Sequence, residues 1–127
     1  MPLQPGLHGS VSTVVVEANT ALAQGTGPVR SLATPAMAVL MEKAALRAIA
    51  DHLPVGHATV GTHLDISHLA PTRIGMTVQA SATLTAVEGR RLLFEVSAED
   101  QAGVVGRGTH ERVIIVLEAF EQKLRTR

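Results

Sequence analysis

Apolar and polar residues alternate along the second half of the chain, a pattern that predicts β-strands. From Thr77 to Val87 apolar and polar residues take turns, and the same alternation returns from Arg91 to Glu99. A period of two is typical of a strand with one buried face. Val104 to Leu117 predicts a long final strand, and turn-forming residues separate the three segments. Consecutive strands joined by tight turns form an antiparallel sheet.

The first half of the chain predicts two further strands and one long helix. β-Branched residues from Val11 to Glu17 predict a first strand, and His57 to Ser67 predicts the strand after the helix. The helix itself runs from Thr34 to Asp51, with Thr34 expected as its N-cap and Pro35 as its first residue. Asn19 to Arg30 is small, polar and glycine-rich, which predicts a mobile loop before the helix.

One charged residue lies on the apolar face of this helix. At about 100° per residue, Lys43, Arg47 and Asp51 fall on one side and Glu42 falls on the other, among apolar residues. Burying an unpaired carboxylate costs on the order of several kcal/mol, so such a residue has a partner or a chemical role. Glu42 is therefore a candidate catalytic residue. A structural carboxylate, paired with an arginine or with the sheet backbone, is the alternative.

The order of these elements defines the fold class. One strand, one helix and four more strands predict an α+β protein in which a curved antiparallel sheet wraps round one central helix. The helix is too apolar to lie on a surface, which favours that central place. We expect a single domain over residues 1–127, with Glu118 to Arg127 as a short helix or a frayed tail.

Composition narrows the classes of function. Hydrophobic residues make up 46% of the 127 residues and charged residues 17%, as in globular proteins, while only 2% are aromatic. An aliphatic core of this kind is thin, so we expect burial between copies of the chain in a homodimer, with a tetramer as a further possibility. The 11 basic and 11 acidic residues balance, which argues against nucleic acid or an acidic membrane surface as a partner.

The chain carries no signal for export or for a membrane. It has no cysteine, and Met1 to Gly6 lacks the basic and apolar regions of a signal peptide. No apolar run approaches the roughly 20 residues that a membrane span needs. These features predict a cytoplasmic protein with no membrane partner.

Six histidines raise the alternative of a metal site. His63 and His68 are an odd number of positions apart, so a regular strand would point them to opposite faces. The chain has neither cysteine nor the His-Glu-x-x-His helix of zinc hydrolases. We therefore expect no bound metal.

Five short strings at particular spacings identify a family. They are Ala33-Thr34-Pro35, Met41-Glu42, Val60-Gly61-Thr62-His63, Ser67-His68-Leu69-Ala70-Pro71-Thr72 and Gly108-Thr109-His110-Glu111-Arg112. Together they resemble the fluoroacetyl-CoA thioesterase-like proteins, over a stretch from about Thr34 to Arg112. The resemblance implies the hotdog fold of that family, a sheet wrapped round a central helix.

The resemblance also implies acyl-CoA thioester hydrolysis by Thr34, Glu42 and His68, with no metal or prosthetic group. Thr34 or Glu42, directly or through an activated water, would attack the thioester carbonyl. The N–H of Gly61 would polarise that carbonyl and His68 would move protons. Arg112 would lie near the site, paired with Glu42 or bound to a CoA phosphate. Without the resemblance, Thr34 is no more than a helix cap, His68 a hydrogen-bonded histidine and Arg112 a solvated side chain.

The segment before the helix departs from the family pattern. The fluoroacetate-specific member closes its site there with phenylalanines, where this chain has Gly25-Thr26-Gly27-Pro28-Val29. This difference predicts a thioesterase that does not select fluoroacetyl groups and has an open or mobile entrance. Two other functions stay open: an acyl-thioester hydratase or dehydratase, and a non-catalytic acyl-CoA-binding protein.

Overall fold

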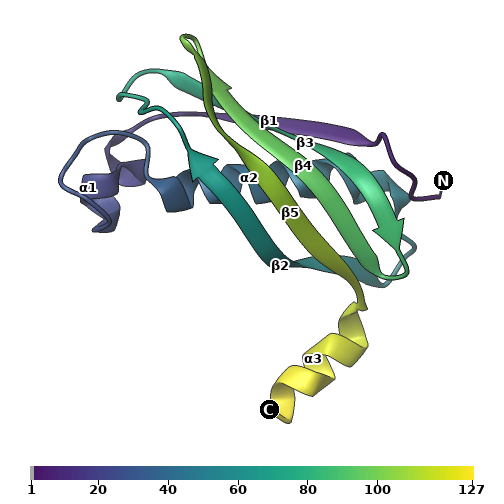
Figure 1. The fold of residues 1–127 in the computed structure, drawn as a ribbon. Helices are drawn as coiled ribbons and strands as arrows, with labels where there is room; N and C mark the ends of the chain where they lie inside the picture. The colour runs from purple at the N-terminus through teal and green to yellow at the C-terminus, as the bar shows by residue number, and fades with distance from the viewer. Residues whose placement is uncertain (1) are drawn as a thin grey trace.

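Five antiparallel strands form one curved sheet around a central helix in the computed structural model, which describes residues 2–127 (Figure 1). The strand order is β1-β3-β4-β5-β2, so β1 and β2 are the two edges. This is the architecture that the order of elements predicted. In chain order the elements are β1 (His8–Val14), η1 (Glu17–Asn19), α1 (Ala21–Gln24), α2 (Thr34–Ile49), η2 (Ala50–His52), β2 (His57–His68), β3 (Thr77–Glu88), β4 (Arg91–Asp100), β5 (Gly103–Val116) and α3 (Leu117–Arg125).

The core lies between α2 and the concave face of the sheet. The alternating positions of β3 and β4 supply buried residues as predicted, and α2 adds Met37, Met41, Ala44, Ala45 and Ala48. Small residues let the helix lie close to the strands: a Cβ at Gly9 of β1 would collide with the backbone of Ala44 and Ala48. The helix packs chiefly on β1 and β3 and has few contacts with β2. The β2 side of α2 is therefore the more open side.

The first strand begins and ends three residues earlier than its β-branched residues suggested. β1 pairs with β3 from His8↔Thr83 to Val14↔Thr77, and the chain then turns away from the sheet. Val15 is nevertheless fully buried in the core, and its N–H donates to the carbonyl of Met76. Val15 is buried in the core although it lies beyond the end of β1. The run of valines therefore predicted a strand boundary that is too late in the sequence.

The start of α2 differs from the prediction by one position. Ala33 is the N-cap and makes no side-chain capping bond, while Thr34 is the first helical residue and Pro35 the second. At the other end the α-helix stops at Ile49, and Asp51 belongs to the following 3-10 turn, η2. The prediction of Thr34 as the N-cap is therefore wrong, and the Thr34 hydroxyl is available for another contact.

The segment predicted as a loop contains a short helix. Thr20 is fully buried, caps α1 by accepting from the N–H of Ala23, and donates to the carbonyl of Glu17. Two backbone bonds, from Leu22 to Val29 and from Ala21 to Ser31, close the segment on itself. Thr20 is the residue whose capping preference could have predicted this helix. Composition alone predicted an irregular segment.

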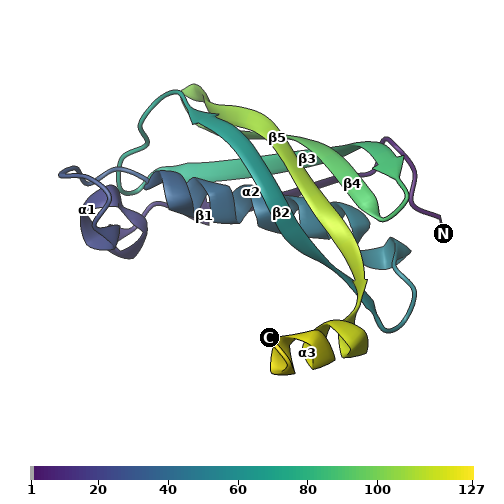
Figure 2. The same cartoon turned by 60° about the horizontal axis from the view of Figure 1, so that its bottom comes forward.

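Helix α3 leaves the end of β5 and projects away from the sheet in both views (Figures 1 and 2). Leu117 begins this helix instead of ending the last strand, and its N–H donates to the carbonyl of Gly56. The C-terminal segment is thus a helix, the first of the two predicted alternatives. No helix within residues 2–127 combines the length and the apolar character required for a membrane span.

Candidate functional site

Thr34 and His68 meet where the first residue of α2 faces the last residue of β2. The Thr34 hydroxyl Oγ1 lies 2.8 Å from Nδ1 of the His68 ring. Thr34 is 34 positions from His68 in sequence, so the fold creates this pair. The hydroxyl is directed to a histidine rather than to the helix end, which rules out the capping interpretation of Thr34.

Burial makes His68 a neutral imidazole. Loss of solvent lowers the pKa of His68 below its ordinary value of 6.5, because the charged form is the one that burial penalises. The ring atom Nε2 is covered and has no hydrogen-bond partner among residues 2–127. A neutral ring that carries its proton on Nε2 can accept the Thr34 proton at Nδ1. An acceptor for the Nε2–H is then the group that this half of the site lacks.

Glu42 lies in a second cluster, with Arg112 of β5. Nη1 of Arg112 is 3.2 Å from Oε2 of Glu42. The Glu42 side chain is 39% exposed to solvent, whereas the Arg112 side chain is 5% exposed. Glu42 therefore stands at the rim of the apolar face of α2, not within it as the helical projection predicted. Leu46, one of the apolar residues on the Glu42 side of the helix, is itself exposed.

Four hydrogen bonds within the chain hold the Arg112 guanidinium. Nε donates to Oγ1 of Thr59 at 2.8 Å, and Nη2 donates to the Thr59 carbonyl at 3.1 Å. Nη1 reaches Glu42 and also Nε2 of His110, at 3.1 Å. Desolvation lowers the pKa of Arg112 and the Glu42 carboxylate opposes that shift. Of the two predicted contacts the structure contains the pair with Glu42, and Arg112 is not the solvated side chain of the alternative interpretation.

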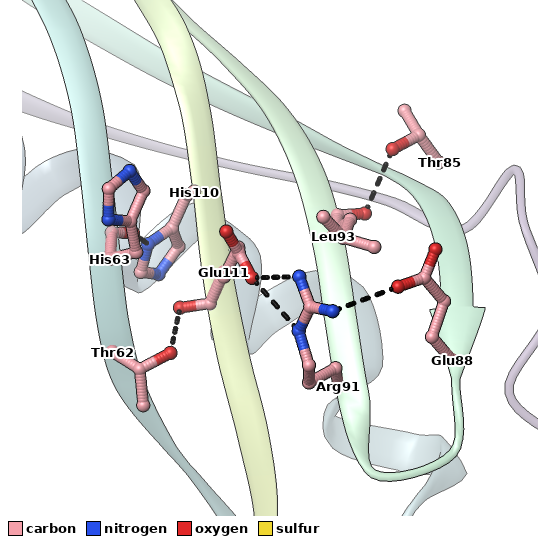
Figure 3. A network of polar contacts seen from close by, with 8 residues as sticks. All are labelled: Thr62, His63, Thr85, Glu88, Arg91, Leu93, His110 and Glu111. Carbon is pink, nitrogen blue, oxygen red and sulfur yellow. Dashed lines mark hydrogen bonds and ion pairs between the residues drawn. The ribbon is translucent and has the colours of Figure 1, made fainter.

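His110 completes the support of this cluster. Its Nδ1 lies 2.8 Å from the carbonyl oxygen of His63 (Figure 3). Nδ1 therefore carries the proton, and Nε2 accepts from Arg112. Burial is the main cause of a lowered His110 pKa. The roles of His110 and Thr59 were not predicted. The available signal was the alternation along β5, which places His110 and Arg112 on the same inward face.

Gly61 leaves room for the Glu42 carboxylate. A Cβ at Gly61 would lie 2.7 Å from Oε2 of Glu42 and 3.2 Å from Nη1 of Arg112, closer than side chains normally approach. A β-bulge follows, because Gly61 pairs with Arg112 and His63 with Glu111 while Thr62 has no register partner. The predicted site residues Gly61, Glu42 and Arg112 are thus neighbours.

The two clusters occupy separate hollows in one chain. Thr34 and His68 line a groove of about 600 Å³, and Glu42 and Gly61 line a smaller hollow of about 220 Å³. Thr34 and Glu42 are eight residues apart on α2, about 12 Å along its axis. A glutamate side chain does not span that distance. A single chain therefore does not bring the three predicted catalytic residues together.

A separate ion-pair network lies on the outer face of the sheet. Arg91 bridges Glu88 and Glu111, and the Glu111 contact is the main cause of a raised Arg91 pKa and a lowered Glu111 pKa (Figure 3). His63 lies near Glu111 and contributes to the lowered Glu111 pKa (Figure 3). No three His, Cys, Asp or Glu side chains within the described range, 2–127, gather as metal ligands would.

Comparison with known proteins connects this geometry to a family. The family model for the fluoroacetyl-CoA-specific thioesterase FlK matches residues 15–118. The fluoroacetyl-CoA thioesterase of Streptantibioticus cattleyicolor is 47% identical over 93 residues, which are 73% of this chain and 67% of that protein.

Solved structures have the same fold over nearly the whole chain. A structure of the fluoroacetyl-CoA thioesterase FlK superposes with a TM-score of 0.92 at 36% identity, covering 100% of this chain and 98% of that one. A threonine-to-serine variant of FlK in complex with acetyl-CoA gives a TM-score of 0.91 at 37% identity, with 98% of each chain covered. A thioesterase superfamily member from Thermus thermophilus gives 0.91 at 31% identity, covering 98% of this chain and 93% of that one. The chain therefore has the hotdog fold of these thioesterases, belongs to the fluoroacetyl-CoA-specific thioesterase family and is a thioester hydrolase.

Proposed function

We propose that this chain hydrolyses acyl-CoA thioesters as a homodimer, in which the Thr34–His68 pair of one copy works with Glu42 and Gly61 of the other. The observation that carries the proposal is the 2.8 Å contact between the Thr34 hydroxyl and Nδ1 of a neutral His68. A hydroxyl is a weak nucleophile unless a base lies within hydrogen-bond reach, and here one does.

The chemistry follows from these positions. His68 accepts the Thr34 proton at Nδ1 while Oγ1 attacks the thioester carbonyl, and Glu42 accepts from Nε2–H and stabilises the imidazolium. The N–H of Gly61 donates to the oxyanion that develops. Collapse of the adduct breaks the C–S bond, the CoA thiolate takes the proton from His68, and the acyl group stays on Thr34. Water, deprotonated by His68, then releases the carboxylic acid and restores the hydroxyl. No metal or prosthetic group enters the scheme.

Several features of one chain favour a second copy as the source of Glu42. His68 Nε2 is covered but unpaired within residues 2–127, and Glu42 keeps one carboxylate oxygen beyond its contact with Arg112. β2 is a 12-residue edge strand, and an uncovered edge of that length is a template for pairing with another chain. Val39 of α2 is 51% exposed. An apolar side chain in this place is suited to an interface between copies.

Two-fold symmetry provides the required exchange. When an antiparallel strand pairs with its own copy, facing residues point to the same face of the sheet, so a regular pairing is centred on one residue. A pairing centred on Asp65 sets His63 opposite Ser67 of the second copy, and the extra residue of the bulge at Thr62 then brings Gly61 opposite His68. For α2 the equivalent centre is Ala38, which places Glu42 beside Thr34 of the second copy. The pairing of the strands and the pairing of the helices thus both bring the Thr34–His68 pair of one copy next to Glu42 and Gly61 of the other.

Arg112 acts on this scheme as a positioning residue. Its guanidinium is buried and bonded to Thr59, His110 and Glu42, so it holds the carboxylate in place. We do not assign it to a CoA phosphate, since four of its five N–H groups already donate within the chain and the side chain is buried.

We further propose that the enzyme does not select fluoroacetyl groups. Neither of the chain's two phenylalanines, Phe94 in the core and Phe120 on α3, lines the groove beside Thr34 as residues 2–127 describe it. Selection for so small a group needs a tight enclosure, and the groove is open.

The test is release of free thiol from a panel of acyl-CoAs by the full chain, with Thr34→Ala, His68→Ala and Glu42→Gln as variants and Lys43→Gln as a control on the exposed face of α2. We expect the first three to lose at least 10²-fold in kcat and the control to keep its rate. Full activity of Glu42→Gln would refute the assignment of this residue. A change in enoyl absorbance without thiol would indicate a hydratase, and binding without turnover an acyl-CoA-binding protein.

A further inference from the structure

The groove beside Thr34 and His68 has an apolar lining. It runs between α1, the chain that leads into α2 and the segment that follows β2. Its volume of about 600 Å³ is within the roughly 300–1,000 Å³ of sites that enclose small organic ligands. Apolar side chains make up most of its wall: Ala21, Val29, Leu32, Pro35, Leu69 and Pro71.

The polar groups of the groove are neutral. Besides Thr34 and His68 they are the hydroxyls of Thr26 and Ser31, and no acidic or basic side chain lines the groove in the described part of the chain. Of the charged residues nearby, Arg30 pairs with Glu17 at 3.0 Å, and Arg73, whose backbone bridges to that of Ser31, is not among the residues that line the groove. A carboxylate at the end of an acyl chain would lose its hydration here without gaining a partner.

The loop that borders the groove has room to spare. A Cβ added at Gly27 would meet only the Cβ of Ala21, at 3.6 Å, which is an ordinary contact. Gly27 is not among the glycines with a positive φ, so a larger residue fits its backbone. Val29 and Leu69 are each 52% exposed, and their side chains are free to cover a ligand.

We infer that this groove is the acyl subsite and that it selects uncharged, apolar acyl groups longer than two carbons, such as straight chains of medium length. The inference rests on the proposed function, because Thr34 at the groove fixes where the thioester carbonyl lies. A two-carbon acyl group would leave most of the apolar wall in water. Each further methylene removes apolar surface from water and strengthens transition-state binding along with substrate binding.

The experiment measures kcat/KM of the full chain for acetyl-, butyryl-, hexanoyl- and succinyl-CoA. Full burial of one methylene corresponds to about fourfold, so we expect butyryl-CoA to exceed acetyl-CoA by about fifteenfold. Succinyl-CoA, with a charged end and a similar chain length, should fall at least tenfold below butyryl-CoA. A flat or falling series, or equal rates for succinyl- and butyryl-CoA, would overturn the inference.

A variant tests the groove itself. Gly27→Phe fills it, so hexanoyl-CoA should lose at least tenfold in kcat/KM while acetyl-CoA keeps its value. Val55→Phe adds the same side chain at a fully exposed turn and serves as the matched control. If both variants treat hexanoyl-CoA like the wild type, the groove is not the acyl subsite.

A separate readout keeps this inference distinct from the proposed function. Hydrolysis that depends on Thr34 but not on the length of the acyl chain would refute this inference and still support the proposed thioesterase function. If no substrate is hydrolysed, titration calorimetry with S-ethyl- and S-hexyl-CoA, which cannot be hydrolysed, applies the same criterion. Tighter binding of the hexyl compound, lost in Gly27→Phe, supports the acyl subsite, and equal affinities refute it.

Discussion

Mixing two inactive variants tests whether the catalytic group is shared between copies of the chain. Thr34→Ala removes the nucleophile from one cluster, and Glu42→Gln removes the carboxylate from the other. Each homodimer is dead at both sites under the proposed arrangement. In a mixed dimer, one site combines the intact Thr34 and His68 of one chain with the intact Glu42 of the other, and the second site lacks both groups.

The expected recovery follows from counting. Random pairing of equal amounts makes about half of all dimers mixed, and each mixed dimer has one working site of two. The mixture should therefore reach about a quarter of the wild-type rate. The basis for this number is the separation of Thr34 and Glu42 by about 12 Å along α2, which prevents the two residues of one chain from sharing a site.

The assay is thiol release after co-expression, or after unfolding and refolding the two variants together to exchange subunits. The control mixture joins Thr34→Ala with His68→Ala, which damage the same cluster and should recover nothing. Absence of recovery in the first mixture, in a sample shown by sedimentation to be dimeric, would refute the shared site. Equal recovery in both mixtures would mean that Thr34 and His68 act from different chains, against the 2.8 Å contact between them.

Further predictions separate the supporting groups from the reacting ones. Gly61→Ala should lower kcat at least tenfold with an unchanged circular dichroism spectrum, because its methyl group would displace the Glu42 carboxylate; an unchanged kcat would contradict this. Arg112→Met should cost about 1–3 kcal/mol in urea unfolding, since the buried acceptors of Thr59 and His110 lose their donor, whereas Arg91→Ala on the exposed network should leave the melting temperature nearly unchanged. Equal destabilisation by the two would mean that burial does not distinguish them. The pKa of His68 is lowered by burial and its neutral form is the base, so kcat/KM should be level from about pH 8 to below 6.5 and fall only in more acid buffer. A fall centred above pH 6.5 would contradict this, and would show that a carboxylate beside His68 outweighs its desolvation.

The sheet could be predicted because its strands carry their burial pattern residue by residue. Val78 to Leu84 and Leu92 to Ala98 alternate in sequence as they do in the structure, and their limits hold to within one residue. β1 could not be placed as well. Its inward positions include Gly9, which is selected by the closeness of α2 and carries no hydrophobic signal. A pattern of apolar residues cannot reveal a contact, such as that of Gly9 with α2, that forms because a side chain is absent.

The site was predictable in its residue types but not in its partners. Arg112 and His110 alternate along β5 in sequence, yet their bonds to Thr59 and to the His63 carbonyl depend on the register of β5 against β2. That register is shifted at Thr62 by a bulge, which leaves no recognisable mark in the sequence. The strand register decides which side chains meet across two strands, and a local sequence pattern does not reveal that register.

The separation of the two clusters, by contrast, was already implied by the numbering. Eight helical residues rise about 12 Å, so Thr34 and Glu42 were never able to share one substrate carbonyl if both lie on the same helix. The family resemblance placed both in one catalytic group, and the helix prediction placed both on one element. Those two statements are compatible only when the helix is present twice. A catalytic group that includes both residues, as proposed above, would therefore draw them from two copies of the chain, the arrangement that the thin aliphatic core first suggested.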